Sequence, residues 1–277
     1  MRCHRRTTTR VVQKVLPVYI QKPCKTMKCA YKKVIQLHSC IGFVAILDLP
    51  DSNGKVVADT LGIQHGSHRV DFFACDVTNN EQVNASFEKI TQLLGSFDVL
   101  VNSAGVLTNG ENWQRMIDVN FTGLVRTTLK AIDLMGKHKG GKGGTIINIS
   151  SMAGLAPVIY YPIYAATKHA IVGLTNSLAL SYNETGVRMM LVCPGRTNTP
   201  LITNLYNFEN PHLTFINVNR ALMCLRTSGN QPPECVAKAI IRLIEKGGNG
   251  AICLVHDGQP PYVVNVQTLD NLVRRPL

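Results

Sequence analysis

The sequence predicts an α/β fold in which a doubly wound parallel sheet forms a single domain. Short apolar runs of strand length alternate with longer segments of helical length from about residue 43 onward. Such alternation is typical of βαβ units, whose parallel strands are covered by helices on both faces of the sheet. The chain has 277 residues, 45% of them hydrophobic, which is enough for one large core without a second domain.

Six apolar runs provide the predicted strands. They span residues 43–47, 70–74, 98–101, 145–149, 189–192 and 251–254. In open α/β sheets, ligands bind at the carboxyl ends of the strands. Asn102, Ser151 and Pro194 each follow one of these runs, so we expect them to lie together at a single site.

Tyr164 and Lys168 are four residues apart in a segment that we interpret as a helix starting near Pro162. Positions i and i+4 share a helix face, so the phenol and the ammonium are expected to point into the same space. A nearby cation favours the phenolate and is expected to lower the pKa of Tyr164 from about 10 toward that of a general base. Ser151, thirteen positions before Tyr164, adds a hydroxyl that can hold a substrate oxygen. The combination fits hydride transfer between an alcohol and a nicotinamide, although a Tyr and a Lys at this spacing also occur on helices by chance.

The neighbouring motifs decide between these readings, because they resemble the short-chain dehydrogenase/reductase family. The motifs span residues 99–105, 146–151, 164–168 and 191–199. They follow the order and spacing of the family and cover the chain from Asp48 to about Asp257, with Ser103 where the family has a second asparagine. The resemblance implies a Rossmann-like domain with NAD-dependent alcohol dehydrogenase activity.

The resemblance also implies roles for the matching residues. The implied catalytic residues are Asn120, Ser151, Tyr164 and Lys168. Tyr164 takes the proton of the alcohol, Ser151 orients the substrate oxygen, and Lys168 binds the nicotinamide ribose. Asn120 is expected to hold a water that links the lysine to solvent. The expected cofactor contacts are Asp48, Asp76, Val77, Asn102, Ala104, Tyr164, Lys168, Pro194, Gly195, Thr197 and Thr199.

Two aspartates concern the adenosine end of the cofactor. Asp48 ends an apolar run, where its carboxylate would bind the ribose and repel a 2′-phosphate, which favours NAD over NADP. Asp76 and Val77 resemble the pair that contacts adenine in the family. Taken singly, either aspartate is about as well explained as a helix N-cap or a turn residue.

Within the family, the chain is similar to the branch of 15-hydroxyprostaglandin dehydrogenases and insect alcohol dehydrogenases. The similarity is carried by residues 112–113, 147–155, 168–173 and 187–188. Three residues before Tyr164, where the prostaglandin enzyme has a glutamine that helps to hold substrate, this chain has Tyr161. We therefore expect Ser151, Tyr161 and Tyr164 to contact a secondary alcohol or ketone of an apolar molecule, under a lid formed by residues 201 to about 226.

The N-terminal segment departs from the family. The family's first strand is followed by a glycine-rich turn that approaches the pyrophosphate, but no glycine precedes Gly42, and counting back from Asp48 leads to residues 24–30. Residues 1–47 hold ten Lys plus Arg and no Asp or Glu. We interpret residues 1–41 as a basic atypical leader and residues 42–277 as the domain. The leader resembles a mitochondrial transit peptide, a nucleic-acid-binding arm, or a foreign segment that replaces the family's own.

Composition excludes several other classes of protein. The nine cysteines lack zinc-type spacing, so free thiols in a reducing compartment and no metal site are expected. No apolar run reaches 18 residues, so no membrane-spanning helix is expected, and no aromatic residues interleave with the basic ones as in a nucleic-acid site. We expect a cytoplasmic protein, with a mitochondrial location as the alternative. By resemblance to the family, we also expect a homodimer or homotetramer in which the helices starting near Glu111 and Pro162 pair between subunits. The expected partner is a small-molecule alcohol or ketone substrate. A catalytically silent family member that binds or dimerises is the alternative function, because the glycine-rich turn is absent.

Overall fold

The computed structural model describes residues 9–14, 41–108, 112–158, 161–203 and 229–265. Residues 24–30, where the glycine-rich turn was expected, and most of the expected lid lie outside these ranges.

One eight-stranded sheet forms the centre of the molecule, with the strand order β3-β2-β1-β4-β5-β6-β7-β8. The strands are β1 (Thr9–Lys14), β2 (Ile41–Asp48), β3 (Val70–Ala74), β4 (Val99–Asn102), β5 (Gly144–Ile149), β6 (Val187–Pro194), β7 (Ile252–Val255) and β8 (Tyr262–Val264). Neighbouring strands are parallel except for the last pair, β7 and β8, which is antiparallel. The doubly wound parallel sheet predicted from the sequence is confirmed.

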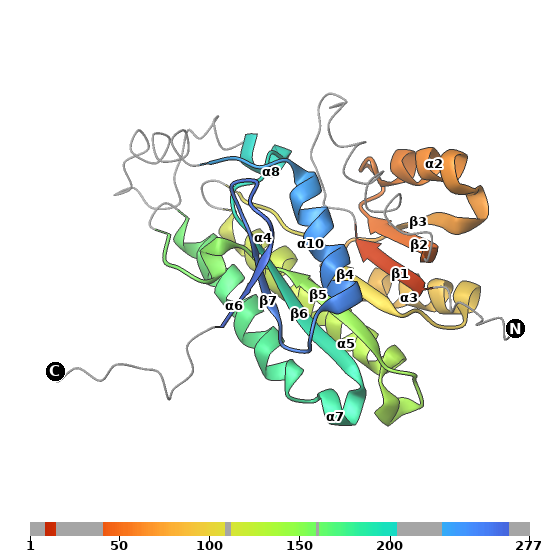
Figure 1. Ribbon diagram of the computed structural model, residues 1–277. Helices are drawn as coiled ribbons and strands as arrows, with labels where there is room; N and C mark the ends of the chain where they lie inside the picture. The colour runs from red at the N-terminus through yellow and green to blue at the C-terminus, as the bar shows by residue number, and fades with distance from the viewer. Residues whose placement is uncertain (1–8, 15–40, 109–111, 159–160, 204–228, 266–277) are drawn as a thin grey trace, which may run out of the picture.

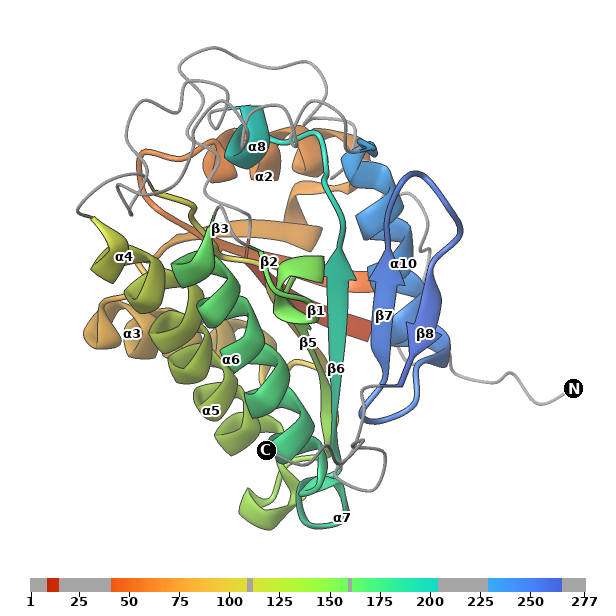
Figure 2. The same ribbon diagram turned by 90° about the vertical axis from the view of Figure 1, so that its left-hand side faces the viewer.

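Helices cover both faces of this sheet (Figures 1 and 2). One face carries α2 (Gly54–His65) and α10 (Pro233–Lys246), and the other carries α3 (Asn80–Leu94), α5 (Gly123–Met135) and α6 (Pro162–Ala179). In β2, Val44 and Ile46 pack toward α2, whereas Ala45 and Leu47 belong to the core beneath α3 and α5. Because strand residues alternate between faces, a strand buried on both sides is apolar throughout, as this run is.

β1 lies in the middle of the sheet, between β2 and β4, although no strand was predicted there from the sequence. Val12 is paired with Ala45 of β2 on one side and Leu100 of β4 on the other. The strand belongs to the stretch interpreted as a leader, and it ends at Lys14, so that residues 15–40 connect it to β2. Residues 24–30, reached by counting back from Asp48, therefore do not follow this strand directly. Residues 15–40 also contain no glycine, and the boundary between residues 41 and 42 stays a prediction.

The connection from β4 to β5 carries an irregular helix that shapes the site. α4 (Trp113–Ile117) leads into a π-helical turn, η2 (Asp118–Thr122), which continues directly as α5. π-helical turns inside α-helices are frequent at functional sites, since the extra residue redirects the side chains of that turn. This turn contains Asn120, which is completely buried.

α6 begins with Pro162 at its first position, where proline is favoured because its missing N–H has no partner within a helix. Its first two turns carry Tyr164 and Lys168. Among the described residues, no helix is long and apolar enough to cross a membrane.

Candidate active site

Ser151 and Tyr164 meet at the carboxyl ends of β5 and β6. Ser151 follows β5 after one residue, and a hydrogen bond joins its side chain to that of Tyr164 on α6. The Ser151 hydroxyl also accepts a hydrogen bond from the Ala153 N–H, with Oγ and N 3.1 Å apart. Its distance to the Pro194 carbonyl oxygen is 3.5 Å, long for a hydroxyl donor, so its proton remains available to the phenol or to a substrate oxygen.

Lys168 lies one helical turn after Tyr164 and is 4% exposed. Its Nζ donates a hydrogen bond to the Ile149 carbonyl at the end of β5, at 3.1 Å. The same Nζ lies over the Tyr164 ring, 5.5 Å from its centre. The predicted shared helix face is therefore observed, with the ammonium against the ring.

Burial dominates the acid–base properties of both groups. Burial raises the pKa of Tyr164 to about 12, and the hydrogen bond from Ser151 lowers it in part. Burial lowers the pKa of Lys168 to about 8. The net shift of the Tyr164 pKa is opposite to the expected one, because burial disfavours the charged forms of both side chains.

Asn120 presents its amide to the loop after β4. Its Oδ1 accepts from the Val106 N–H at 2.7 Å, and its Nδ2 donates to the Val106 carbonyl at 2.9 Å and to Thr167 Oγ1 at 3.3 Å. Gly105 lies beside this amide and beside the lysine: a Cβ there would be 3.5 Å from Asn120 Oδ1 and 3.7 Å from Lys168 Nζ. Asn120 and Lys168 therefore face the same small space across a residue without a side chain.

Asn102, expected to contact cofactor, uses its side chain inside the protein. Its Nδ2 donates to Thr128 Oγ1 at 2.8 Å and to Asn148 Oδ1 at 2.9 Å, and its Oδ1 accepts from Thr127 Oγ1 at 2.8 Å. These bonds tie β4 to β5 and α5. Any contact between Asn102 and a cofactor would come from its backbone, and the half-buried Ala104 lies two residues further along the same loop.

The adenosine-side residues follow β2 and β3. Asp48 is buried at the end of β2, where its Oδ1 accepts from the Leu49 N–H at 2.8 Å. After β3, Asp76 Oδ1 accepts from both the N–H and the hydroxyl of Thr78, each at 2.9 Å. β2 and β3 are adjacent, so both aspartates lie at the same edge of the sheet.

The segment after β6 is fixed by contacts within the protein. The Gly195 N–H donates to the Val255 carbonyl at 2.7 Å, and a Cβ on Gly195 would lie 2.5 Å from the Cβ of His256. Thr197 Oγ1 donates to the Gly195 carbonyl at 2.9 Å, and Thr199 Oγ1 donates to the Thr197 carbonyl at 3.3 Å. Pro194 and these residues therefore form a compact turn beside Ser151.

Tyr161 is the residue before Pro162 and is 6% exposed, and burial raises its pKa to about 12. It lies one helical turn before Tyr164. A contact between Tyr161 and substrate stays a prediction.

Sequence reasoning missed the structural role of Ser150. Its hydroxyl donates to the Lys168 carbonyl at 2.8 Å and hydrogen-bonds the buried thiol of Cys193. Gly154 has no side chain where a Cβ would overlap both Ser150 and Lys168. Ser150 and Ser151 face opposite sides, because successive side chains alternate along an extended chain. The hydrogen bond from Ser150 links the end of β5 to α6. The sequence signal for this role was that Ser150 directly precedes Ser151, the serine expected to be catalytic.

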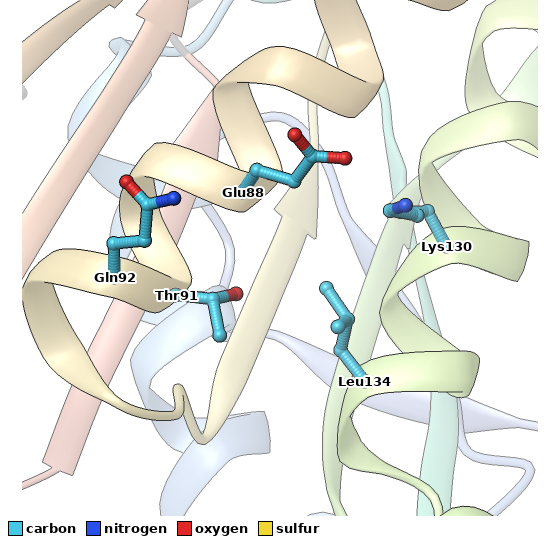
Figure 3. A pocket seen from close by; sticks show the side chains of 5 residues that line it. All are labelled: Glu88, Thr91, Gln92, Lys130 and Leu134. Carbon is cyan, nitrogen blue, oxygen red and sulfur yellow. The ribbon is translucent and has the colours of Figure 1, made fainter.

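A shallow hollow between α3 and α5 is separate from this site (Figure 3). Its lining residues are Glu88, Thr91, Gln92, Lys130 and Leu134. None of them belongs to the predicted site. In the described part of the chain, no three His, Cys, Asp or Glu side chains come together as metal ligands.

The chain is similar to several known proteins over most of its length. The family model described as short chain dehydrogenase matches residues 38–210 and leaves the first 37 residues outside the match. The 15-hydroxyprostaglandin dehydrogenase [NAD(+)] of Rattus norvegicus is 36% identical over 228 residues, 80% of this chain and 84% of that protein. Alcohol dehydrogenase 1 of Ceratitis capitata is 36% identical over 185 residues, 66% of this chain and 70% of that protein.

Solved structures show the same fold. A short-chain type dehydrogenase/reductase from Mycobacterium marinum superposes with a TM-score of 0.73 at 24% identity, covering 91% of this chain and 96% of that one. ElxO with NADP bound gives a TM-score of 0.68 at 25% identity, covering 91% and 98% of the two chains.

Proposed function

The chain belongs to the short-chain dehydrogenase family and is a nicotinamide-dependent oxidoreductase, and we propose that it transfers hydride between NAD and a secondary alcohol or ketone of an apolar substrate. The observation that carries the proposal is the Ser151–Tyr164 hydrogen bond with Lys168 one turn away, at the carboxyl edge of the sheet. The rat relative is named as an NAD(+) enzyme, which supports the choice of cofactor and of a secondary alcohol.

The residues present fit the two ends of a nicotinamide dinucleotide. Asp76 Oδ2 and the Val77 N–H have no hydrogen-bond partner in the described part of the chain, and they form an adjacent acceptor and donor that match the N6 and N1 positions of adenine. Asp48 would hold the adenosine ribose. Lys168 and the turn at Pro194 and Gly195 would hold the nicotinamide end, and the remaining predicted contacts, Ala104, Thr197 and Thr199, lie in the flanking loops.

Tyr164 carries the proton in the proposed reaction. A bound nicotinamide would supply the hydride chemistry, as the hydride acceptor NAD in alcohol oxidation and as the hydride donor NADH in ketone reduction. During oxidation the phenolate of Tyr164 takes the hydroxyl proton, and during reduction the phenol donates it to the carbonyl oxygen. Ser151 holds that oxygen through its hydroxyl. Because burial raises the pKa of Tyr164 to about 12, the protonated form dominates at neutral pH and favours the donor role.

Lys168 and Asn120 support that proton transfer. The ammonium over the Tyr164 ring stabilises negative charge that develops on the phenol, through attraction between cation and ring. We propose that a water beside Gly105 connects Lys168 with Asn120, whose amide is already oriented by the Val106 backbone. This water would give the buried ammonium of Lys168 a polar contact on the side of Asn120.

The oligomeric state and the cellular location are inferred from what is usual in the family. We propose a homodimer or homotetramer formed through the faces of α5 and α6, and a cytoplasmic location, with a mitochondrial location as the alternative given the basic residues 1–41. Sedimentation and cell fractionation test these two points.

The second candidate is a catalytically silent member that keeps the fold for binding or dimerisation. It is favoured by the absence of glycine from residues 15–40, which follow β1 where the family's phosphate turn stands. In a glycine-rich turn, backbone N–H groups bind the pyrophosphate, and the charges of lysine side chains alone do not replace these donors.

Turnover distinguishes the two candidates. The purified full-length chain is assayed with NAD and a panel of apolar secondary alcohols, and with NADH and the matching ketones, by the absorbance of NADH. Turnover that requires Tyr164 supports the enzyme. A folded chain without turnover on any of these substrates supports the silent member.

A further inference from the structure

Arg126 lies outside every motif that predicted the site, yet it contacts the adenine side of that site. It belongs to the first turn of α5, and its Nη1 donates to the Val77 carbonyl at 2.6 Å. The two residues are 49 positions apart, so this contact exists because the fold brings α5 against the loop after β3. Hydrogen bonds from a guanidinium are charge-assisted and among the stronger ones in proteins.

The same helix also holds the Val77 side chain. A Cβ on Gly123 would lie 2.8 Å from Val77 Cγ2 and 2.9 Å from Val77 Cβ, so the glycine permits the valine to pack directly on the helix backbone. Val77 is 3% exposed. Its carbonyl and its side chain are therefore both held by α5, which also fixes the position of the Val77 nitrogen on the same Cα.

Asp76 is held from the other side. Its N–H donates to Gln82 Oε1 at 2.8 Å, and its Oδ1 accepts from Thr78. Oδ2 of Asp76 and the N–H of Val77 are left as the two groups of this turn without partners among the described residues. A fixed acceptor beside a fixed donor is complementary to the amino group and ring nitrogen of an adenine edge.

We propose that Arg126 is a positioning residue for adenine recognition: it holds the backbone of Val77 from the carbonyl side, while Gln82 and Thr78 hold Asp76, so that the Val77 N–H and the Asp76 acceptor both face the base. The inference rests on the proposed use of a nicotinamide dinucleotide. Residues 15–40 contain no glycine to form a bare phosphate turn. A larger share of the binding free energy then falls on the adenosine end, and the contribution of Arg126 is correspondingly large.

Binding of three probes to the full-length chain tests the role of Arg126. NADH contains both ends of the cofactor, AMP only the adenosine end, and reduced nicotinamide mononucleotide only the nicotinamide end. In Arg126→Met, we expect Kd to rise about tenfold for NADH and AMP, and less than about twofold for the mononucleotide. Arg126→Lys keeps a donor and a charge, and is expected to recover part of the loss.

Lys130→Met is the matched control. Lys130 lies one turn further along α5 and lines the hollow in Figure 3, so the variant removes one positive charge from the same helix away from Val77. We expect its three dissociation constants to equal those of the unmodified chain. An equal loss for all three probes in Arg126→Met would show a general structural role, and unchanged binding would show no role. Either result would overturn the assignment.

Failure of the proposed function gives a different pattern. If the unmodified chain binds AMP but not NADH, the dehydrogenase proposal fails, while a tenfold loss of AMP binding in Arg126→Met still supports the positioning role. If the unmodified chain binds none of the three probes, both proposals are overturned.

Discussion

Lys168 contacts the ring of Tyr164, with Nζ 5.5 Å from the ring centre, while the hydroxyl of Tyr164 is hydrogen-bonded to Ser151. The cation therefore acts on the phenol through the face of the ring, and the polar contact to the reacting oxygen comes from the serine. This division explains why the pKa of Tyr164 is set mainly by burial. Lys168 contributes a positive charge, Ser151 a hydrogen bond and Tyr164 the hydroxyl that exchanges the proton.

Tyr164→Phe is expected to lower turnover by about 10³-fold, because the variant removes the group that exchanges the proton. The phenol contacts Ser151 at one edge of the site, so the melting temperature should change little. Steady-state rates and thermal melting of the same preparation check both points. Turnover that survives in the phenylalanine variant would show that another group carries the proton.

The two directions of the reaction are expected to respond differently to pH. Burial raises the pKa of Tyr164 to about 12, so the deprotonated fraction grows with pH while Lys168, with a pKa of about 8, is still charged. Between about pH 6 and 8, alcohol oxidation should rise nearly tenfold per pH unit, whereas ketone reduction should stay constant. Initial rates in both directions measure this. A flat oxidation profile would contradict a buried, protonated tyrosine.

Lys168→Met is expected to abolish most of the turnover and yet stabilise the fold at neutral pH. The pKa of Lys168 is lowered from 10.5 to about 8, so the folded state binds this proton more weakly than the unfolded state does. The destabilisation caused by burying the charged lysine is fully present below pH 8 and disappears as pH rises toward 10.5. The free energy of unfolding therefore increases with pH in that window. Removing the charge should raise the free energy of unfolding by up to about 3 kcal/mol at pH 7.

Urea unfolding at about pH 7 and pH 10 checks the lysine prediction, since the gain should shrink at the higher pH. A methionine variant that is less stable than the original chain at neutral pH would mean that the bond from Lys168 to the Ile149 carbonyl outweighs the burial of the charge.

Asp48→Asn is expected to weaken the preference for NADH over NADPH by about tenfold, because it removes the charge that would repel a 2′-phosphate. The amide can still accept the hydrogen bond from the Leu49 N–H, which keeps the end of β2 intact. Dissociation constants for both cofactors measure the preference. An unchanged ratio would show that the carboxylate does not face the ribose.

The sequence predicted the sheet well where strands are buried on both faces, since β2 and β4 to β7 are almost wholly apolar runs. It did not predict β1, whose six residues TRVVQK include just two apolar ones between polar neighbours. The backbone pairing of β1 with both β2 and β4 holds it in the sheet despite that composition. Such pairing is a property of the fold and leaves no periodic signal.

The sequence predicted that Ser151, Tyr164 and Lys168 lie together, but it predicted fewer of the contacts that support them. The spacing of Tyr164 and Lys168 on one helix predicted their common face, which the structure shows. The contact of Arg126 with Val77 joins residues far apart in the sequence, and the polar network of Asn102 joins three elements. Neither pattern can be read from local spacing. The pKa of Tyr164 was also mispredicted, because burial of both groups is a tertiary property.

Titration of the purified full-length chain with NADH tests the central claim most directly, with nicotinamide fluorescence and the melting temperature followed together. We expect saturable binding with a rise in melting temperature, as for any ligand that binds only the folded state. A chain that melts cooperatively but binds no NADH at about millimolar concentration, near the weak limit of specific affinity, would contradict the account. It would show that the missing glycine turn after β1 prevents cofactor binding in this protein.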